Sequence, residues 1–443
     1  MIEGIVRDHG EDRTVTLFLR NVGEVPHDEQ SKDRFWIFQA KLAVRSSDPA
    51  RPPIFRRRPF SMPGDPADPL RQEDLELSMR YRHDVEFAVG HGVAADWANP
   101  AEGDPQRTNE VFTAVAPTYE VAQQTPPTEQ DAGFEGLKDV VVDMKTLAEG
   151  GRDTVIPALR ALVSTYGEWI ERQRARIGAG ADGLAEHPDA GPRAIDRCER
   201  ARDRIAKGVD ILETDDEAWQ AFQFANRAMW QQRVRSVYVR QMRAARVAKK
   251  LDPSAAMPTL EEVDANPRNR SWRIFQLAFL ILNVESTTDL THHDRVHPTD
   301  AVADLLWFPT GGGKTEAYLG LAAYAIGLRR LQGDRYGRRG SAGVTVLMRY
   351  TLRLLTLQQF QRATALICAI EMIRREANAA GDDRWGTRDE PFGIGLWVGA
   401  KTTPNWTANS DKVLKAMAGD PWNYQNTSGD GSPHQLEYCP WCG

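Results

Sequence analysis

The feature that most constrains this chain is a glycine-rich turn set between an apolar run and a helix-forming run. The turn reads Pro309-Thr310-Gly311-Gly312-Gly313-Lys314-Thr315, and the apolar runs on either side cover residues 305–308 and 316–331. Glycines let backbone N–H groups turn inward around phosphate oxygens, and the N-terminus of the following helix attracts the same anion. The sequence therefore predicts a strand, a phosphate loop and a helix, in that order.

The residues of this turn have defined roles in such a loop. Lys314 would contact the β- and γ-phosphates, and the Thr315 hydroxyl would ligate Mg²⁺. The strict pattern has glycine at the position of Phe308, and the local form Pro-Thr-Gly-Gly-Gly-Lys-Thr is instead typical of superfamily-2 helicases. We predict that residues 309–315 bind ATP and Mg²⁺, with Lys314 and Thr315 as catalytic residues.

Length, composition and net charge limit the classes of protein to which this loop can belong. The chain has 443 residues, of which 41% are hydrophobic and 27% charged, so we expect two to four globular domains. No window approaches the ~18 apolar residues of a membrane span, and no secretory signal is visible, so we expect a cytoplasmic protein without membrane contact. The net charge of −6 argues against coating nucleic acid by bulk charge but leaves room for a local basic channel.

The pattern of apolar residues changes twice along the chain. Residues 1–125 read as a β-rich accessory domain, with extended runs at the following positions: 14–19, 34–40, 84–94 and 111–121. Residues 126–265 read as a helical domain, with helices expected over these ranges: 154–177, 193–212 and 217–251. Residues 178–192 look like a loop, and 123–127 like a linker.

A basic series marks the end of the last of these helices. Its members are Arg233, Arg235, Arg240, Arg243, Arg246, Lys249 and Lys250. One interpretation is a solvated helix surface, and the other is contact with a nucleic-acid backbone.

Residues 266–443 read as a truncated α/β domain of the RecA-like phosphate-loop type. Further strands are expected at 343–348 and 393–398, with a helix at 352–379 between them. Strands that alternate with helices imply a parallel sheet covered on both faces.

Polar residues follow both of these expected strands. Thr351, Arg353 and Gln358 come after the first, in a stretch that resembles a helicase motif that holds the phosphates of a DNA strand. Thr403 follows the second and would cap a helix whose first residue is Pro404. The sequence predicts DNA-backbone contacts at these four positions, without base readout.

Four cysteines in a chain of this length do not make a disulfide framework. Cys198 and Cys368 stand alone in helical patterns, which favours buried thiols. Cys439 and Cys442 form a Cys-x-x-Cys turn, which is half of a zinc ribbon and needs two further ligands.

A motor of this class also needs an Asp-Glu pair after an apolar strand. Asp389-Glu390 follows a polar loop, and Asp143 has the right local form but lies far upstream of the phosphate loop. The acidic pair and a second, arginine-bearing motor domain are therefore expected outside these residues.

Several strings together resemble one family, the DrmA-type helicases of DISARM anti-phage defence systems. The strings are residues 307–318, 349–356, 395–399 and 439–443, with 86–92, 224–229 and 275–279 upstream. The resemblance implies an ATP-dependent DNA-binding protein that prefers single-stranded DNA or DNA with a single-stranded end. It also implies a defence-system partner protein and a DNA methyltransferase. Gln276, preceded by Phe275, takes the place of an adenine-recognising glutamine in related helicases.

Three functions remain open at this point. The first is the N-terminal part of a DNA helicase or translocase. The second is a nucleotide-gated DNA sensor or scaffold, which would bind ATP without DNA-stimulated turnover. The third is a phosphate-loop kinase, which would act on a small acceptor and show no stimulation by DNA.

Overall fold

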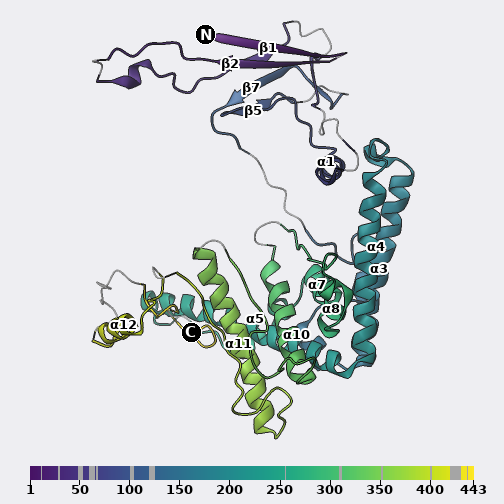
Figure 1. Ribbon diagram of the computed structural model, residues 1–443, viewed down its shortest axis with the longest axis vertical. Coiled ribbons are helices and arrows are strands. Elements are labelled where there is room, and N and C mark those ends of the chain that lie inside the picture. The colour runs from purple at the N-terminus through teal and green to yellow at the C-terminus, as the bar shows by residue number, and fades with distance from the viewer. Residues whose placement is uncertain are drawn as a thin grey trace. The chain divides into compact units, whose positions relative to one another are not determined.

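The computed structural model describes the chain except residues 11, 28–29, 48–52, 59–64, 66–67, 100–103, 119–124, 255, 309–311, 351–352, 400–401, 420–430 and 437. The chain divides into two compact units (Figure 1). The first consists of Met1–Gln123 and Ala175–Ala194, and the second of Gln124–Arg174 and Ile195–Gly443.

The strands of the first unit form small antiparallel sheets. β1 (Ile2–His9) pairs with β2 (Asp12–Leu19) in a register that sets Ile2 opposite Leu19. β7 (Glu110–Ala114) lies between β3 (Ala43–Arg45) and β5 (Ala94–Trp97), and β4 (Phe55–Arg56) pairs with β6 (Arg107–Thr108). The expected strand 14–19 is confirmed within β2. Of the expected strand 111–121, residues 111–114 lie in β7, 115–118 form no strand, and 119–121 lie outside the described residues.

Two expected strands of this unit are wrong. Residues 34–40 begin inside a 3₁₀ turn, η1 (Lys32–Phe35), and the left-handed Gln39, at φ 51°, interrupts the extended run. Residues 84–94 form no strand before Ala94, because a turn that contains Gly92 at φ 73° precedes β5.

A helix that the sequence analysis did not predict completes the first unit. α1 (Pro69–Arg80) starts with the Asp68 carboxylate, which accepts a hydrogen bond from the Leu70 N–H at 3.0 Å. Asp68 and Pro69 are the cap and first-position residues that favour a helix start.

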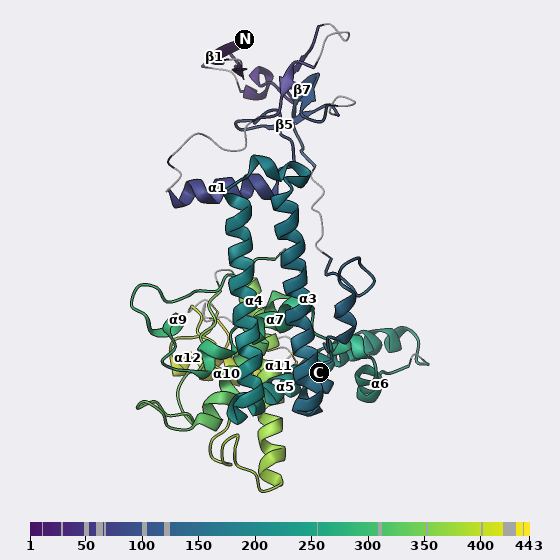
Figure 2. The ribbon, with the colours of Figure 1, turned by 90° about the vertical axis from the view of Figure 1, so that its right-hand side faces the viewer.

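Two long helices, α3 (Arg152–Gly178) and α4 (Ala190–Thr214), run side by side (Figure 2). Ion pairs link them, among them Arg174–Glu199 at 2.6 Å and Arg160–Glu213 at 2.7 Å. They confirm the helices expected at 154–177 and 193–212. The expected loop 178–192 contains η3 (Ala181–Glu186) and the first residues of α4.

The second unit is helical around α5 (Asp216–Leu251), which packs against α2 (Met144–Glu149), α10 (Lys314–Gln332) and α11 (Arg353–Ala379). Its shorter elements are η2 (Glu135–Asp139), α6 (Leu260–Ala265), η4 (Pro267–Asn269), α7 (Ile274–Leu282), α8 (Val284–Thr288), α9 (His293–Val296) and α12 (Thr407–Gly419). The helices expected at 217–251, 316–331 and 352–379 are confirmed.

One hydrophobic core holds these helices together. It contains fully buried Phe222, Leu277 and Tyr324, so residues of the expected helical and motor domains share it. Asn226 is buried within it; its side chain accepts from Trp272 Nε1 at 2.8 Å and donates to the Phe222 carbonyl at 2.9 Å, so neither polar group of the side chain is left unpaired.

The expected parallel sheet is not formed among the described residues of 266–443. The runs 305–308, 343–348 and 393–398 carry no strand, and Leu305, Leu347 and Trp397 are 85%, 79% and 99% exposed. A parallel strand must pair with neighbours that are distant in sequence, and no strand of the described residues pairs with these runs. The described residues therefore do not show the expected parallel sheet, and the structure that they show is mixed helical with small antiparallel sheets.

No helix of the described residues is long and apolar enough to span a membrane.

Candidate nucleotide-binding site

The start of α10 carries the part of the glycine turn that the structure describes. Gly313 caps the helix in the left-handed region, at φ 89°, and Lys314 is its first residue. A Cβ atom at Gly313 would stand 2.6 Å from Gln276 Nε2, so both the backbone angle and the space require glycine. Pro309, Thr310 and Gly311 lie outside the described residues.

The segment that leads into α7 braces this turn. Arg273 Nη1 donates to the Gly312 carbonyl at 2.6 Å, and Gln276 Nε2 donates to the Gly313 carbonyl at 2.7 Å. The Phe275 ring stacks on Phe308, with 4.0 Å between centroids. The backbone of the turn is thus held from one side by α7.

Lys314, the first residue of α10, provides a cation at the turn predicted to hold the phosphates. Its Nζ donates to the Phe308 carbonyl at 2.5 Å, so the amine folds back over the turn. Because the lysine side chain is long and flexible, exchanging one carbonyl for phosphate oxygens requires only rotamer changes. The residues present fit a phosphate group: a cation, helical N–H groups and the Thr315 hydroxyl.

Gln276, which the sequence predicts to recognise adenine, is bonded within the protein at both ends of its amide. It is 3% exposed; its Oε1 accepts from the Arg273 N–H at 2.8 Å, while its Nε2 is bonded to Gly313. Both ends of the amide are therefore engaged within the protein, which makes Gln276 a brace of the turn.

Glu316 brings two arginines to the same turn. Its carboxylate is 7% exposed and accepts from Arg362 of α11, and Arg233 of α5 lies 3.5 Å from the same oxygen. Burial lowers the pKa of Arg233, with Arg273 and Arg240 adding to the effect, and burial with Arg233 lowers the pKa of Arg362. Neither arginine was assigned to this site from the sequence. The periodicity that marks Arg233 as basic and helical carries no information on which helix it faces.

The residues predicted to contact DNA are only partly described. Thr351 lies outside the described residues, as does the side chain of Arg353, the first residue of α11; Gln358 is exposed on the same helix. Thr403 is half-buried, and its N–H bonds to the Gly399 carbonyl at 3.2 Å. α12 begins only at Thr407, so the predicted helix cap at Thr403 is wrong.

Neither candidate acid lies free beside the turn. Asp143 caps α2 through two backbone N–H groups and pairs with Arg270 at 3.1 Å. Glu390 accepts from the Thr387 N–H and hydroxyl, and these bonds lower its pKa. Both roles are structural, as their sequence context indicates.

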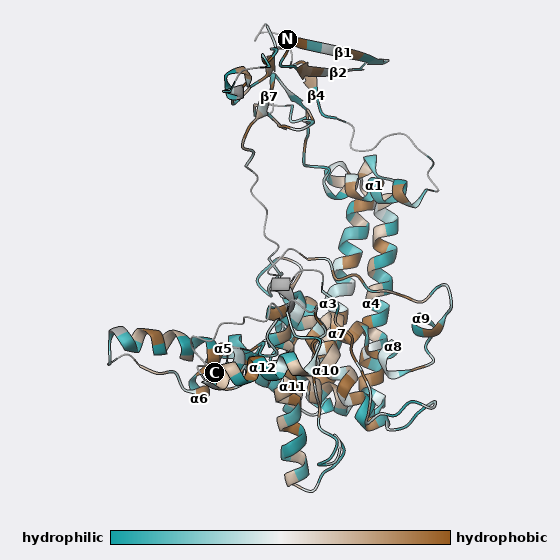
Figure 3. Cartoon of the chain, turned by 60° about the vertical axis from the view of Figure 1, so that its left-hand side comes forward, coloured by the Kyte–Doolittle hydropathy of each residue, from teal (hydrophilic) through white to brown (hydrophobic). Residues whose placement is uncertain are grey.

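The Cys-x-x-Cys turn lies against the basic end of α5, which is largely hydrophilic (Figure 3). The Arg235 guanidinium stacks on Trp441 at 4.6 Å and that of Arg243 on Tyr438 at 3.9 Å. Two members of the basic series thus contact aromatic residues of the same chain, which differs from both interpretations given for the series from the sequence.

Cys198 and Cys368, which were expected to be buried thiols, are only half-buried. Burial opposes ionisation of Cys439, but N–H groups, those of Trp441 and Cys442 foremost, outweigh it and lower its pKa. Cys368 is half-buried, and its pKa is raised by burial and by the nearby Cys439 and Cys442, so it does not stand alone. Cys198 is also half-buried and interacts with Tyr166.

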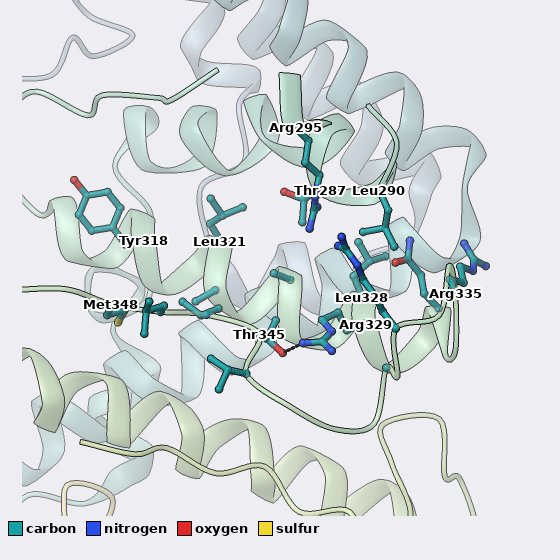
Figure 4. A pocket seen from close by; sticks show the side chains of 18 of the residues that line it. Thr287, Leu290, Arg295, Tyr318, Leu321, Leu328, Arg329, Arg335, Thr345 and Met348 are labelled. Carbon is teal, nitrogen blue, oxygen red and sulfur yellow. Dashed lines mark hydrogen bonds between the residues drawn. The ribbon is translucent and has the colours of Figure 1, made fainter. Parts of the chain in front are cut away.

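A cavity of about 720 Å³ lies beside α10 but away from Lys314 (Figure 4). Leu321 and Leu328 line it from α10, and Thr345 and Met348 line it from the expected strand 343–348. Arg329 closes one side, where it donates to the Thr345 hydroxyl at 2.8 Å. The cavity thus lies between α10, residues 287–295, residues 333–340 and residues 344–350.

A left-handed glycine that caps a buried helix and precedes Lys-Thr defines a class: proteins with a phosphate-loop sequence. No family model matches the chain. It is 34% identical over 379 residues to the DISARM protein DrmA of Bacillus paralicheniformis, an alignment that covers 82% of this chain and 29% of that protein. The chain is thus similar to this DISARM protein over most of its own length, and it spans about 29% of the length of that curated relative.

Proposed function

We propose that this chain is part of an ATP-dependent DNA helicase or translocase of a bacterial anti-phage defence system. The observation that carries the proposal is the start of α10, where Gly313, Lys314 and Thr315 stand at the N-terminus of a buried helix and α7 braces the glycines. Similarity to a DISARM protein supports the defence role and a partner protein in the same system. The proposed setting is the cytoplasm.

In this proposal residues 309–315 bind ATP, and Thr315 ligates Mg²⁺. Mg²⁺ would neutralise charge that develops on the phosphates, while the helix N-terminus and Lys314 hold the β- and γ-oxygens. ATP hydrolysis requires an available Asp-Glu pair; Glu316 is paired with two arginines, and Asp143 and Glu390 are bonded elsewhere, so we assign hydrolysis to the complete protein.

We further propose that the runs 305–308, 343–348 and 393–398 are strands of a RecA-like sheet that is completed by other parts of the complete protein. Each run is apolar and exposes a large side chain, Leu305, Leu347 or Trp397, and the first two runs precede α10 and α11. Contiguous exposed apolar segments of this kind mark surfaces that a partner element covers. DNA would then lie across the ends of these strands, at Thr351, Arg353, Gln358 and Thr403.

Substitution of the lysine tests the nucleotide site. Lys314→Ala is expected to weaken ATP binding at least tenfold, or ~1.4 kcal/mol, because it removes a cation directed at the phosphates. Lys415→Ala is the matched control, since Lys415 is exposed on α12 and pairs with Asp411. Unchanged ATP affinity in folded Lys314→Ala protein would reject the site.

The DNA contact has its own test. Arg353→Ala is expected to weaken single-stranded DNA binding and to reduce its salt slope by up to about one charge. The same slope in wild type and variant would reject a phosphate contact at Arg353.

The sensor or scaffold remains the alternative. It predicts tight ATP binding by the complete protein without DNA-stimulated ATP turnover, whereas the motor predicts such stimulation. A kinase predicts turnover that depends on a small acceptor.

We also propose that Cys439 and Cys442 are half of a structural zinc site, since backbone N–H groups already stabilise a thiolate at Cys439. Loss of bound zinc in Cys439→Ser but not in Cys198→Ser protein, measured by elemental analysis, is the expected result. Retention of zinc in Cys439→Ser would reject this site.

A further inference from the structure

Glu316 connects the start of α10 to two helices that come from distant parts of the chain. Its carboxylate Oε1 is shared by Arg362 of α11 and Arg233 of α5, and its Oε2 stands 3.5 Å from the position of a Cβ on Gly313. Arg233 is fixed in turn, because its Nε donates to the Asn269 carbonyl at 3.2 Å. One buried carboxylate thus meets the glycine turn, α5 and α11.

This carboxylate cannot change partners freely. It is 7% exposed, and a buried charge that loses its counter-ion is strongly unfavourable. The side chains of Arg233 and Arg362 are 27% and 35% exposed, and this partial burial lowers the pKa of each. When the first turn of α10 moves, the arginines must therefore follow Glu316 or leave charges unpaired.

Arg362 lies on the helix that carries the predicted DNA contacts. It stands four residues after Gln358, so the two side chains share a face of α11, and Arg353 is the first residue of the same helix. A helix moves as a rigid element, so a shift at Arg362 is passed to its N-terminus.

We infer that Glu316 and Arg362 couple occupancy of the phosphate loop to the affinity of the α11 N-terminus for DNA. The inference rests on the proposed function and adds to it two positioning residues, which need not touch ATP or DNA. Glu316 sits two residues beyond Lys314, so phosphate binding acts directly on the helical turn that holds it.

The test is a binding cycle on the complete protein. The affinity for a fluorescent single-stranded oligonucleotide is measured with and without a non-hydrolysable ATP analogue, and the ratio is the coupling factor. We expect a factor of at least five in the wild type. Glu316→Gln is expected to bring it within twofold of one, while ATP and DNA each still bind alone.

The structure offers a matched control on the same two helices. Arg227 of α5 and Glu376 of α11 form an ion pair at 2.5 Å that is exposed and distant in sequence from the turn. If Glu316 only holds α5 to α11, Glu376→Gln should lower the factor equally; we expect it to leave the factor unchanged. Arg362→Met provides a second variant if Glu316→Gln protein does not fold.

The outcomes separate the inference from the proposed function. If wild-type protein fails to bind ATP, or if Lys314→Ala binds it normally, the proposed site itself is wrong. If both ligands bind with a factor near one in the wild type, or if Glu316→Gln and Arg362→Met keep the wild-type factor, the site stands and the coupling inference is overturned.

Discussion

The second unit contains two kinds of apolar segment, and they behave differently. α10 buries its apolar residues, with Leu319 at 1% exposure, whereas the run 343–348 that follows it leaves Val344 at 78% and Leu347 at 79%. Both segments are apolar enough for a core. Apolar content alone therefore does not decide which part of this chain is packed.

The difference follows from where each backbone finds its hydrogen bonds. α10 satisfies its N–H and C=O groups within the helix and needs neighbours only for one face. A strand needs at least one neighbouring strand, usually distant in sequence, to pair its N–H and C=O groups. The helices of this unit therefore pack around α5 without further elements. The three apolar runs have no partner strand among the described residues and stay largely exposed.

The largest predicted effect concerns the packed region. Leu277 of α7 is fully buried in the shared core, so Leu277→Ala should cost about 2–5 kcal/mol of unfolding free energy through lost contacts and a cavity. Urea unfolding followed by circular dichroism measures this.

Leu347→Ala is the matched substitution in the exposed region. In the chain of 443 residues it should change stability by less than about 0.5 kcal/mol. In a longer chain that completes the sheet, the same substitution should approach the cost at Leu277. A large effect in the short chain would contradict the exposed state of this run.

This contrast also explains which features the sequence could predict. Helical periodicity is local, so 154–177, 217–251 and 352–379 were predicted within a few residues, and the glycine at the start of α10 was read from its motif. Pairing of strands is not local, so the sheet expected around residues 343–348 could not be judged from the runs themselves. The roles of Arg233, Arg273 and Glu316 depend on tertiary packing of distant segments, which one sequence does not show.

The second-largest predicted effect concerns Glu371, which lies where the packed helix α11 meets the segment that precedes residues 393–398. Glu371 of α11 accepts from Arg374, Arg375 and the Phe392 N–H, and thereby ties the chain that precedes 393–398 to the helix. Burial opposes ionisation of Glu371, but these hydrogen bonds outweigh it and lower its pKa to about 2, from 4.5. Glu371→Gln should therefore cost about 2–3 kcal/mol at neutral pH.

The pH dependence of this contribution follows from the sign of the shift. A lowered pKa in the folded state stabilises fully above the unfolded value of 4.5, and the stabilisation is lost as the pH falls toward 2. Wild-type protein should lose more stability than Glu371→Gln across this window. Glu376→Gln, on the same helix but in an exposed pair with Arg227, should cost no more than about 1 kcal/mol. Equal costs at the two positions would mean that the Phe392 segment is not fixed through Glu371.

The smallest predicted effect tests whether local hydrogen bonds at its start are enough to stabilise the short helix α6. α6 has six residues, and its start is closed by Thr259, whose hydroxyl accepts from the Glu262 N–H at 3.2 Å while the Glu262 carboxylate accepts from the Thr259 N–H at 2.9 Å. Thr259→Ala should cost about 1 kcal/mol, because a helix this short has few other hydrogen bonds. Amide hydrogen exchange should then accelerate within α6 first, whereas Thr259→Ser, which keeps the accepting oxygen, should preserve the wild-type rates.

If Thr259→Ala leaves exchange in α6 unchanged, the burial of Val263 rather than the cap holds this helix. The distinction between locally satisfied helices and partner-dependent strands would then be less sharp than α10 and residues 343–348 suggest.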